Sequence, residues 1–204
     1  SSNGTSGSSA TLSVTNLTVE TGGVLSADSL GFREEFGAGQ GLSADGGTHG
    51  GQGGDFDANG TVPSCYGSIT NPISLGSKGW DTATCDCPGG GAVIVNASGT
   101  ITVNGRISAD GGTSLSGGAG GSVYLQATNI IGAGTVRANG GSNTQYNSGG
   151  GGRVAAVLTS GTDFSNITFQ SFGGTVDKEG AAGTVYLEDA SDGTGGGELI
   201  IDNN

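Results

Sequence analysis

The feature that most constrains this chain is an internal repeat of about 31 residues. Four segments carry glycine at their second position and continue with alternating apolar residues; they are Gly90–Val95, Gly120–Leu125, Gly151–Ala156 and Ala182–Leu187. These glycines are residues 91, 121, 152 and 183, so the spacings are 30, 31 and 31 residues. Such an even interval indicates one supersecondary unit that is used several times.

Each unit closes on a polar stretch followed by two glycines. Examples are Ser108–Gly112, Arg137–Gly141 and the earlier copy Ser43–Gly47. Asp or Asn before glycine is typical of a turn that needs positive φ. Between opening and close, short alternating runs such as Val93–Val95 and Ile101–Val103 predict strands with one buried face.

Three short strands and a glycine-rich loop in every unit predict an all-β fold, a parallel β-helix (β-solenoid) of about five to six coils. We expect one domain over residues 1–204, with residues 1–10 flexible or forming an intersubunit N-terminal segment. An antiparallel sandwich is the alternative, but it does not explain the recurring interval. The residues expected to face the core are Val93, Val95, Ile101, Val103, Ile107, Val123, Leu125, Ile131, Val136, Val154, Ala156, Leu158, Ile167, Phe169, Val185, Leu187, Leu199 and Ile201.

Composition excludes several classes of protein. Glycine supplies 46 of the 204 residues, and each interior glycine would cost a helix about 1 kcal/mol, so a helical bundle is excluded. Acids outnumber bases 18 to 6, giving a formal charge of −12, and so few cations predict no nucleic-acid partner. No apolar stretch approaches the roughly 20 residues of a membrane helix, so we expect no membrane insertion.

Several segments resemble a glycine-rich β-helix repeat family of large secreted and cell-surface proteins of bacteria and archaea. The resemblance is carried by Tyr66–Ser77, Gly99–Gly112, Gly149–Ala155, Gly183–Leu187 and Glu198–Asn203. It covers roughly Leu12 to Asn204 and implies a right-handed parallel β-helix in a secreted or cell-surface protein, with no catalytic residues to carry over. The cysteines and Trp80 depart from the family's pattern.

Cys65, Cys85 and Cys87 are the three cysteines. A disulfide from Cys65 to either of the others would close a loop of about 20 residues, add about 3 kcal/mol of stability and suit an oxidising compartment. Three free buried thiols are the alternative, and a leftover cysteine can also pair between molecules. The spacing of the cysteines and His49 does not match a zinc site.

Asp55, Asp57 and Asn59 precede Gly60 with the one–three–five spacing of the first half of a calcium loop. The twelfth position is Tyr66 rather than glutamate, and no flanking helices are predicted. Two interpretations therefore stay open: bound calcium, with Asp45 completing the ligands, and a solvated acidic turn.

Five Asn-x-Ser/Thr sequons occur, at Asn3, Asn16, Asn59, Asn96 and Asn166. Together with a serine-rich start that lacks methionine, they favour a processed, secreted glycoprotein. Sequons also arise by chance in a chain rich in Asn, Ser and Thr, so glycosylation is an expectation at each position.

We expect no enzyme activity. His49 is the only histidine and lies in a glycine-rich segment, and the chain has no Gly-x-Ser-x-Gly elbow. No pair of carboxylates is singled out for glycoside hydrolysis, and the repeats hold few bases for lyase chemistry.

These features predict a secreted structural or adhesive protein at a cell surface. Its copies would stack end to end into an extracellular filament, because end coils present unpaired backbone groups and no cap is visible in residues 1–10 or after Ile201. The alternative is a carbohydrate-binding module of a larger adhesin or polysaccharide-active enzyme. The aromatic residues that would bind surface glycans are Tyr66, Trp80, Tyr124, Tyr146 and Tyr186, of which Tyr124 and Tyr186 share one repeat position.

Overall fold

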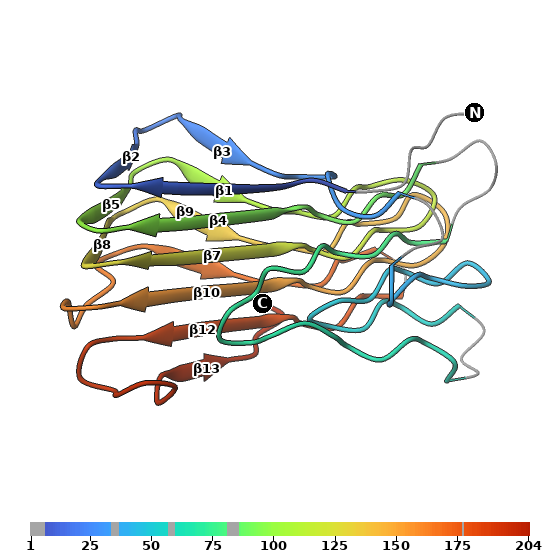
Figure 1. The fold of residues 1–204 in the computed structure, drawn as a ribbon. Helices are drawn as coiled ribbons and strands as arrows, with labels where there is room; N and C mark the ends of the chain where they lie inside the picture. Colours follow the sequence, from blue (N-terminus) through green and yellow to red (C-terminus); the bar gives the residue numbers. More distant parts are fainter. Residues whose placement is uncertain (1–6, 34–36, 57–59, 81–85, 177) are drawn as a thin grey trace.

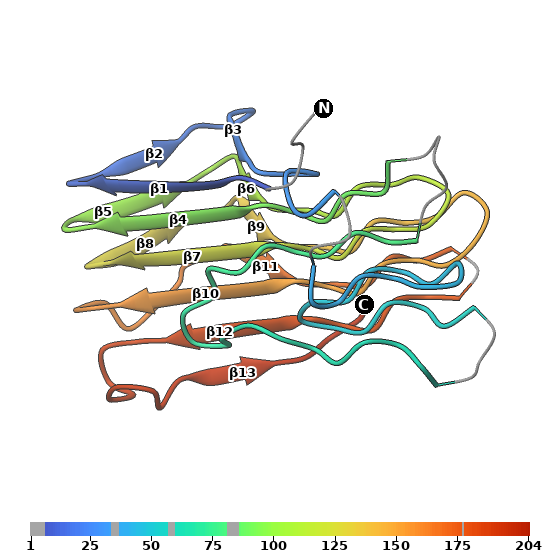
Figure 2. The ribbon, with the colours of Figure 1, turned by 45° about the vertical axis from the view of Figure 1, so that its right-hand side comes forward.

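The computed structural model describes residues 7–33, 37–56, 60–80, 86–176 and 178–204. This part of the chain forms thirteen β-strands and no helix, hence no helix that would cross a membrane. The strands gather in one half of the molecule, and glycine-rich segments without strands fill the other half (Figure 1, Figure 2). We call these halves the sheet stack and the glycine bundle.

Sheet A contains six strands in the order β1-β4-β7-β10-β12-β13. The first five run parallel, and β13 pairs antiparallel with β12. Their bounds are β1 Ser9–Val14, β4 Ala92–Ala97, β7 Ser122–Ala127, β10 Arg153–Leu158, β12 Thr184–Glu188 and β13 Glu198–Ile200. Figure 1 shows β1 at one end of the stack and β13 at the other.

The two smaller sheets are parallel throughout. Sheet B has the order β2-β5-β8 and sheet C the order β11-β9-β6-β3. The strands of sheet B are β2 Leu17–Val19, β5 Thr100–Val103 and β8 Asn129–Gly132. Those of sheet C are β3 Val24–Ser26, β6 Arg106–Ser108, β9 Thr135–Arg137 and β11 Thr168–Gln170.

Equivalent positions of successive repeats are paired directly. Val93 pairs with Val123, Val123 with Val154, and Val154 with Val185. Each of these valines is at most 5% exposed, so the repeat interval stacks one β-branched side chain on the next in a buried row. Such cross-strand stacking of β-branched residues is the unit of sheet stabilisation.

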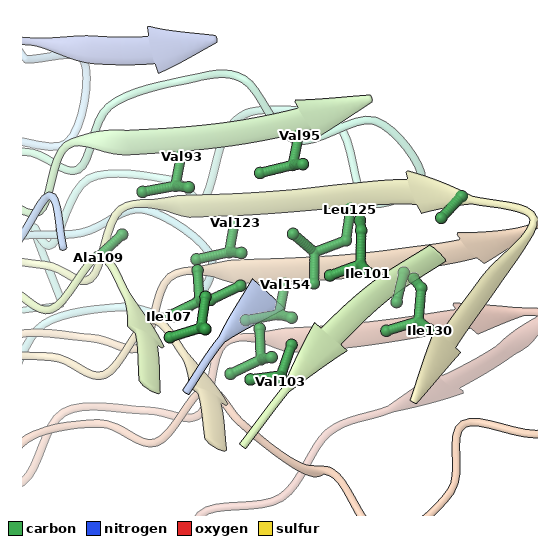
Figure 3. Close-up of a cluster of buried hydrophobic side chains, with 14 of the residues drawn as sticks. Val93, Val95, Ile101, Val103, Ile107, Ala109, Val123, Leu125, Ile130 and Val154 are labelled. Atoms are coloured by element: carbon green, nitrogen blue, oxygen red, sulfur yellow. The ribbon is translucent and has the colours of Figure 1, made fainter. Parts of the chain in front are cut away.

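The hydrophobic core lies between the three sheets (Figure 3). Fully buried side chains include Ile101, Ile107, Leu125 and Ile130. Most residues expected in the core are there, and Ile167, Phe169 and Leu187 pack against it while partly buried.

The expectation is wrong for three residues, since Ile131, Leu199 and Ile201 are 41%, 45% and 66% exposed. The register of sheet B explains the first. Ile130, not Ile131, pairs with buried Ile101 and therefore takes the inward position.

The expected fold class, a right-handed parallel β-helix (β-solenoid) of five to six coils with glycine-rich loops, is wrong. The described residues form three separate sheets of six, four and three strands, and the largest is mixed because β13 turns back on β12. Residues 159–167 contain no strand, so sheet B ends at β8. The glycine-rich segments are not simply loops that join coils, because they pack on one another over about half of the molecule (Figure 2).

The glycine bundle is held by hydrogen bonds between backbone segments that are far apart in the sequence. The amide of Gly47 donates to the carbonyl of Gly117 at 2.9 Å, and the carbonyl of Gly47 accepts from the amide of Gly150 at 2.9 Å. The amide of Gly120 in turn donates to the carbonyl of Gly150 at 3.0 Å. Buried backbone groups must be paired, and here each segment finds its partners on its neighbours.

Side chains would not fit at these contacts. A Cβ atom at Gly117 would lie 1.8 Å from the carbonyl oxygen of Gly141, and one at Gly46 would lie 1.9 Å from that of Ser148. Such distances are far below any real Cβ contact, so glycine is required for the close approach of two backbones.

A ladder of Asp and Asn side chains links the closing segments of the repeats. Asp28 Oδ1 accepts from the amide of Asp110 at 2.8 Å, and Asp110 Oδ1 accepts from the amide of Asn139 at 2.9 Å. Asn139 Oδ1 extends the ladder by accepting from the amide of Phe172 at 2.9 Å. The polar residue before the two glycines at Asp110 and Asn139 therefore joins one repeat to the next. The positive φ predicted for the glycines that follow is wrong, because none of Gly111, Gly112, Gly140 and Gly141 has it; they are needed for close backbone contact instead.

The close approach of backbones predicts a large effect of a single methyl group. We expect Gly117→Ala to reduce the free energy of unfolding by about 3 kcal/mol or more, because the neighbouring backbone has to move. Gly193→Asn is the control, since Gly193 has φ +73°, which Asn tolerates, and a Cβ atom there would meet no heavy atom within 4 Å. Urea denaturation measures both; equal stabilities for the two variants would contradict the packing described.

Candidate assembly surface

The N-terminal end of the sheet stack presents three edge strands. β1, β2 and β3 are the outermost strands of sheets A, B and C, and each pairs on one side only among the described residues. An edge strand exposes unpaired N–H and C=O groups, which is a template for pairing with another chain.

The open backbone groups of β1 follow from its pairing with β4. The amide of Ala92 donates to Ser8 O, and that of Ser98 donates to Val14 O. Parallel pairing alternates along the strand, so the amides of Ser9, Thr11 and Ser13 point away from β4. These residues are exposed, as the burial pattern of β1 shows.

The same end leaves part of the hydrophobic core uncovered. Leu12, Val14, Leu17 and Leu25 pack against the core but are only partly buried. β1, β2 and β3 contain no charged residue, and the turn that joins β2 to β3 adds one exposed acid, Glu20. Natural edge strands are usually protected by charge, proline or a cover, and neither charge nor proline occurs in the three strands.

The C-terminal end is built differently. After β12 the chain reverses, and β13 pairs Ile200 with Val185 so that Ile200 packs on the core. Asn203 then bonds to the glycine bundle: its Oδ1 accepts from the amide of Gly173 at 2.7 Å, and its Nδ2 donates to Gly180 O at 3.0 Å. The sequence predicted no cap after Ile201, but this end is partly covered.

The C-terminal end is also acidic. Residues 184–204 contain five acids and no base; the acids are Glu188, Asp189, Asp192, Glu198 and Asp202. Leu199 and Ile201 stand exposed among them. The two ends of the stack therefore share exposed apolar side chains and edge strands but differ in charge.

His49 is fully buried in the glycine bundle. Its Nδ1 lies 2.8 Å from Gly120 O, and because a carbonyl can only accept, this nitrogen carries the proton. Nε2 has no hydrogen-bond partner among the described residues. The pKa of His49 is lowered to about 4, chiefly by burial and in smaller part by the charge of Arg153, against the opposing effect of the Gly120 carbonyl.

The surroundings of His49 fix its position rather than activate it. The ring of Tyr66 lies 4.7 Å from that of His49 between centroids, and the Tyr66 hydroxyl donates to Leu75 O at 2.6 Å. Arg153 Nε donates to Tyr66 O at 2.8 Å, and Arg153 also reaches Thr184 Oγ1 at 3.1 Å. Burial raises the pKa of Tyr66 to about 12.

Sequence reasoning missed the role of Arg153. Its register partners in sheet A are Ser122 and Thr184, and Ser122 in turn pairs with Ala92, so the other residues of this row are small. An arginine that stands alone among small residues at one repeat position indicates that its side chain binds a partner outside the strand. The partner is the segment at Tyr66 that covers His49.

Of the predicted calcium ligands, Asp57 and Asn59 lie outside the described residues. Asp55 Oδ2 accepts from the amide of Gly60 at 2.8 Å, and Asp45 Oδ1 accepts from the amide of Phe56 at 2.8 Å. Within the described ranges no group of three His, Cys, Asp or Glu side chains is placed to hold a metal. Bound calcium stays a prediction.

The cysteines and sequons are only partly described. Cys65 is exposed and Cys87 is buried, while Cys85 lies outside the described residues, so the disulfide stays a prediction. Asn16, between β1 and β2, and Asn166, in a turn before β11, are both exposed. Asn3 and Asn59 also lie outside the described residues.

Asn96 lies in β4 and lines an open groove of about 610 Å³ together with Ser13, Gln126 and Thr159. Glycosylation at all five sequons stays a prediction.

The shared repeat position of Tyr124 and Tyr186 is confirmed, since both lie in one row of sheet A on either side of Ala155. The row is not an exposed platform, because Tyr186 is buried, with its hydroxyl bonded to Glu188 and accepting from the amide of Gly197. Tyr146 instead packs edge to face with Trp80 at 5.2 Å and with Phe56 at 5.9 Å.

The Lys178 ammonium lies 5.8 Å from the centroid of the Phe56 ring, and Phe56 is 48% exposed. We call Phe56, Trp80 and Tyr146 the aromatic cluster. Sequence reasoning missed Phe56 and Lys178, because only the fold brings them together with Tyr146.

Comparison with protein-family models, with curated proteins and with solved structures finds no match to this chain. The resemblance to the glycine-rich repeat family therefore stays a prediction.

The buried neutral His49 predicts acid sensitivity. Its pKa is lower in the folded chain than the ordinary 6.5, so protonation favours unfolding; its contribution to stability is complete above pH 6.5 and is lost as the pH falls toward 4. The expected loss is about 3 kcal/mol over this range.

The control is His49→Asn, which keeps an N–H donor for Gly120 O but does not titrate. Urea denaturation at pH 7, 5.5 and 4 should give a shallower pH dependence for this variant. Parallel profiles for the two proteins would contradict the assignment.

Proposed function

We propose that this protein is a secreted structural or adhesive component of a cell surface, whose copies stack end to end into an extracellular filament. Its role is then physical rather than catalytic. The observation that carries the proposal is the N-terminal end, where three edge strands that contain no charged residue and a half-covered apolar core face outward.

The build of the rest of the molecule supports a structural role. The backbones of the glycine bundle are hydrogen-bonded to their neighbours at contact distance, which leaves little room for local movement. Because hydrogen bonds join each repeat to the next, the stack can transmit force from one end to the other. A rigid protein with one unprotected edge is suited to be a subunit of a filament.

The aromatic cluster favours a second candidate, a carbohydrate-binding module. An exposed aromatic face is a surface on which a sugar ring can stack, and Phe56 is half exposed beside the Lys178 ammonium. This function does not require self-association, so the two candidates can be separated by experiment.

Self-association should appear as assemblies that grow with protein concentration. Added salt should favour them as well, because it screens the repulsion between copies that each carry a formal charge of −12. Sedimentation velocity and electron microscopy of the purified protein measure this, with a glycan array run in parallel. Only monomers at every concentration would contradict the proposed function, and array binding that Trp80→Ala abolishes would favour the carbohydrate-binding module.

A further inference from the structure

The two ends of sheet A are unlike, and this restricts how two copies can meet. Contact between two C-terminal ends would bring two sets of five acids together. Contact between two N-terminal ends would bring only Glu20 of each copy together but leaves Leu199 and Ile201 of both copies in water. Contact between unlike ends covers the apolar side chains of both and places the five acids against edge strands that carry no charge.

Strand geometry agrees with contact between unlike ends. β1 and β13 are the two outer strands of the same sheet, and each has one free edge among the described residues. Sheets B and C end at β8 and β11, before β12 and β13 of sheet A. β13 is thus the outermost strand at the C-terminal end of the described stack, where the next copy would meet it first.

We propose that copies associate head to tail, with β13 of one copy pairing antiparallel to β1 of the next. The inference rests on the proposed end-to-end assembly and names its junction. The direction follows from the fold: β13 is antiparallel to β12, and β1 is parallel to β12 through the sheet, so a second copy in the same orientation presents β1 antiparallel to β13.

The register of the junction can be read from the face of sheet A that lies opposite the hydrophobic core. Thr11 pairs with Ile94, and Leu199 pairs with Tyr186. Both pairs belong to one row that crosses the sheet through Tyr124 and Ala155. Continuation of this row places Thr11 of the next copy beside Leu199.

The junction fixes the dimension of the assembly. Each copy contributes six strands to a continuous sheet A. With strands about 4.8 Å apart, the axial rise per copy is about 29 Å.

The open amide of Thr11 gives a selective test. Thr11→Pro removes an N–H that points away from β4, and proline is tolerated on an edge strand. We expect this variant to stay monomeric in sedimentation velocity at concentrations where the wild-type assembles, with at least a tenfold loss of association. Thr11→Ala is the matched control, since it shortens the same side chain and keeps the amide, and it should assemble like the wild-type.

Cross-linking identifies the ends that meet, and it does not depend on the folding of the proline variant. Thr11→Cys and Leu199→Cys variants are mixed, oxidised gently and mapped by peptide mass spectrometry. A link between positions 11 and 199, with a rise of about 29 Å in electron micrographs, is the expected result.

Two other outcomes are separable. Links between two copies of position 11 with dimers that do not grow would overturn the head-to-tail junction but leave self-association intact. Monomers only, with no link of either kind, would overturn the proposed function as well.

Discussion

The structure depends on backbone hydrogen bonds that run from one repeat to the next. In the sheet stack they join parallel strands of successive repeats, and in the glycine bundle they join segments such as those at Gly47, Gly117 and Gly150. A single hydrogen bond adds only about 1 kcal/mol, but an unpaired buried amide or carbonyl costs more than that. The backbone groups of a repeat are therefore all paired only when the repeat has a neighbour on both sides. Among the described residues, the outermost strand at each end of sheet A has a neighbour on one side only.

The sheet stack and the glycine bundle pair their backbone groups with the help of different kinds of residue. In the sheet stack, rows of valine, isoleucine and leucine fill a narrow core, which is why 32% apolar residues are enough. In the glycine bundle, the absence of side chains lets backbones touch, and the side chains of Asp110 and Asn139 join the closing segments of successive repeats. Burial raises the pKa of Asp110 while its contacts with Asn139 and Arg137 oppose the rise, as expected for a carboxylate used as a fixed acceptor.

Much of the sheet stack could be predicted from the sequence, because the interval of the repeat fixes which residues pair. Val93, Val123, Val154 and Val185 were expected inside and lie in one buried row. The fold class was wrong because period and alternation do not show where a chain reverses, as it does before β13, or that glycine segments pack on each other. The contacts around His49 and in the aromatic cluster join residues far apart in the sequence, and the spacing of residues along the chain does not predict such contacts.

Among the described residues of a single copy the outer edge of β1 is open, and we expect it to become paired when copies meet. Amide hydrogen exchange at Ser9, Thr11 and Ser13, followed over a range of protein concentrations, measures this directly. We expect fast exchange in dilute protein and protection that grows with concentration, while the amides of β7 stay protected throughout. Slow exchange of these three amides in protein that sediments as a monomer would show that the edge is already covered and would contradict the account.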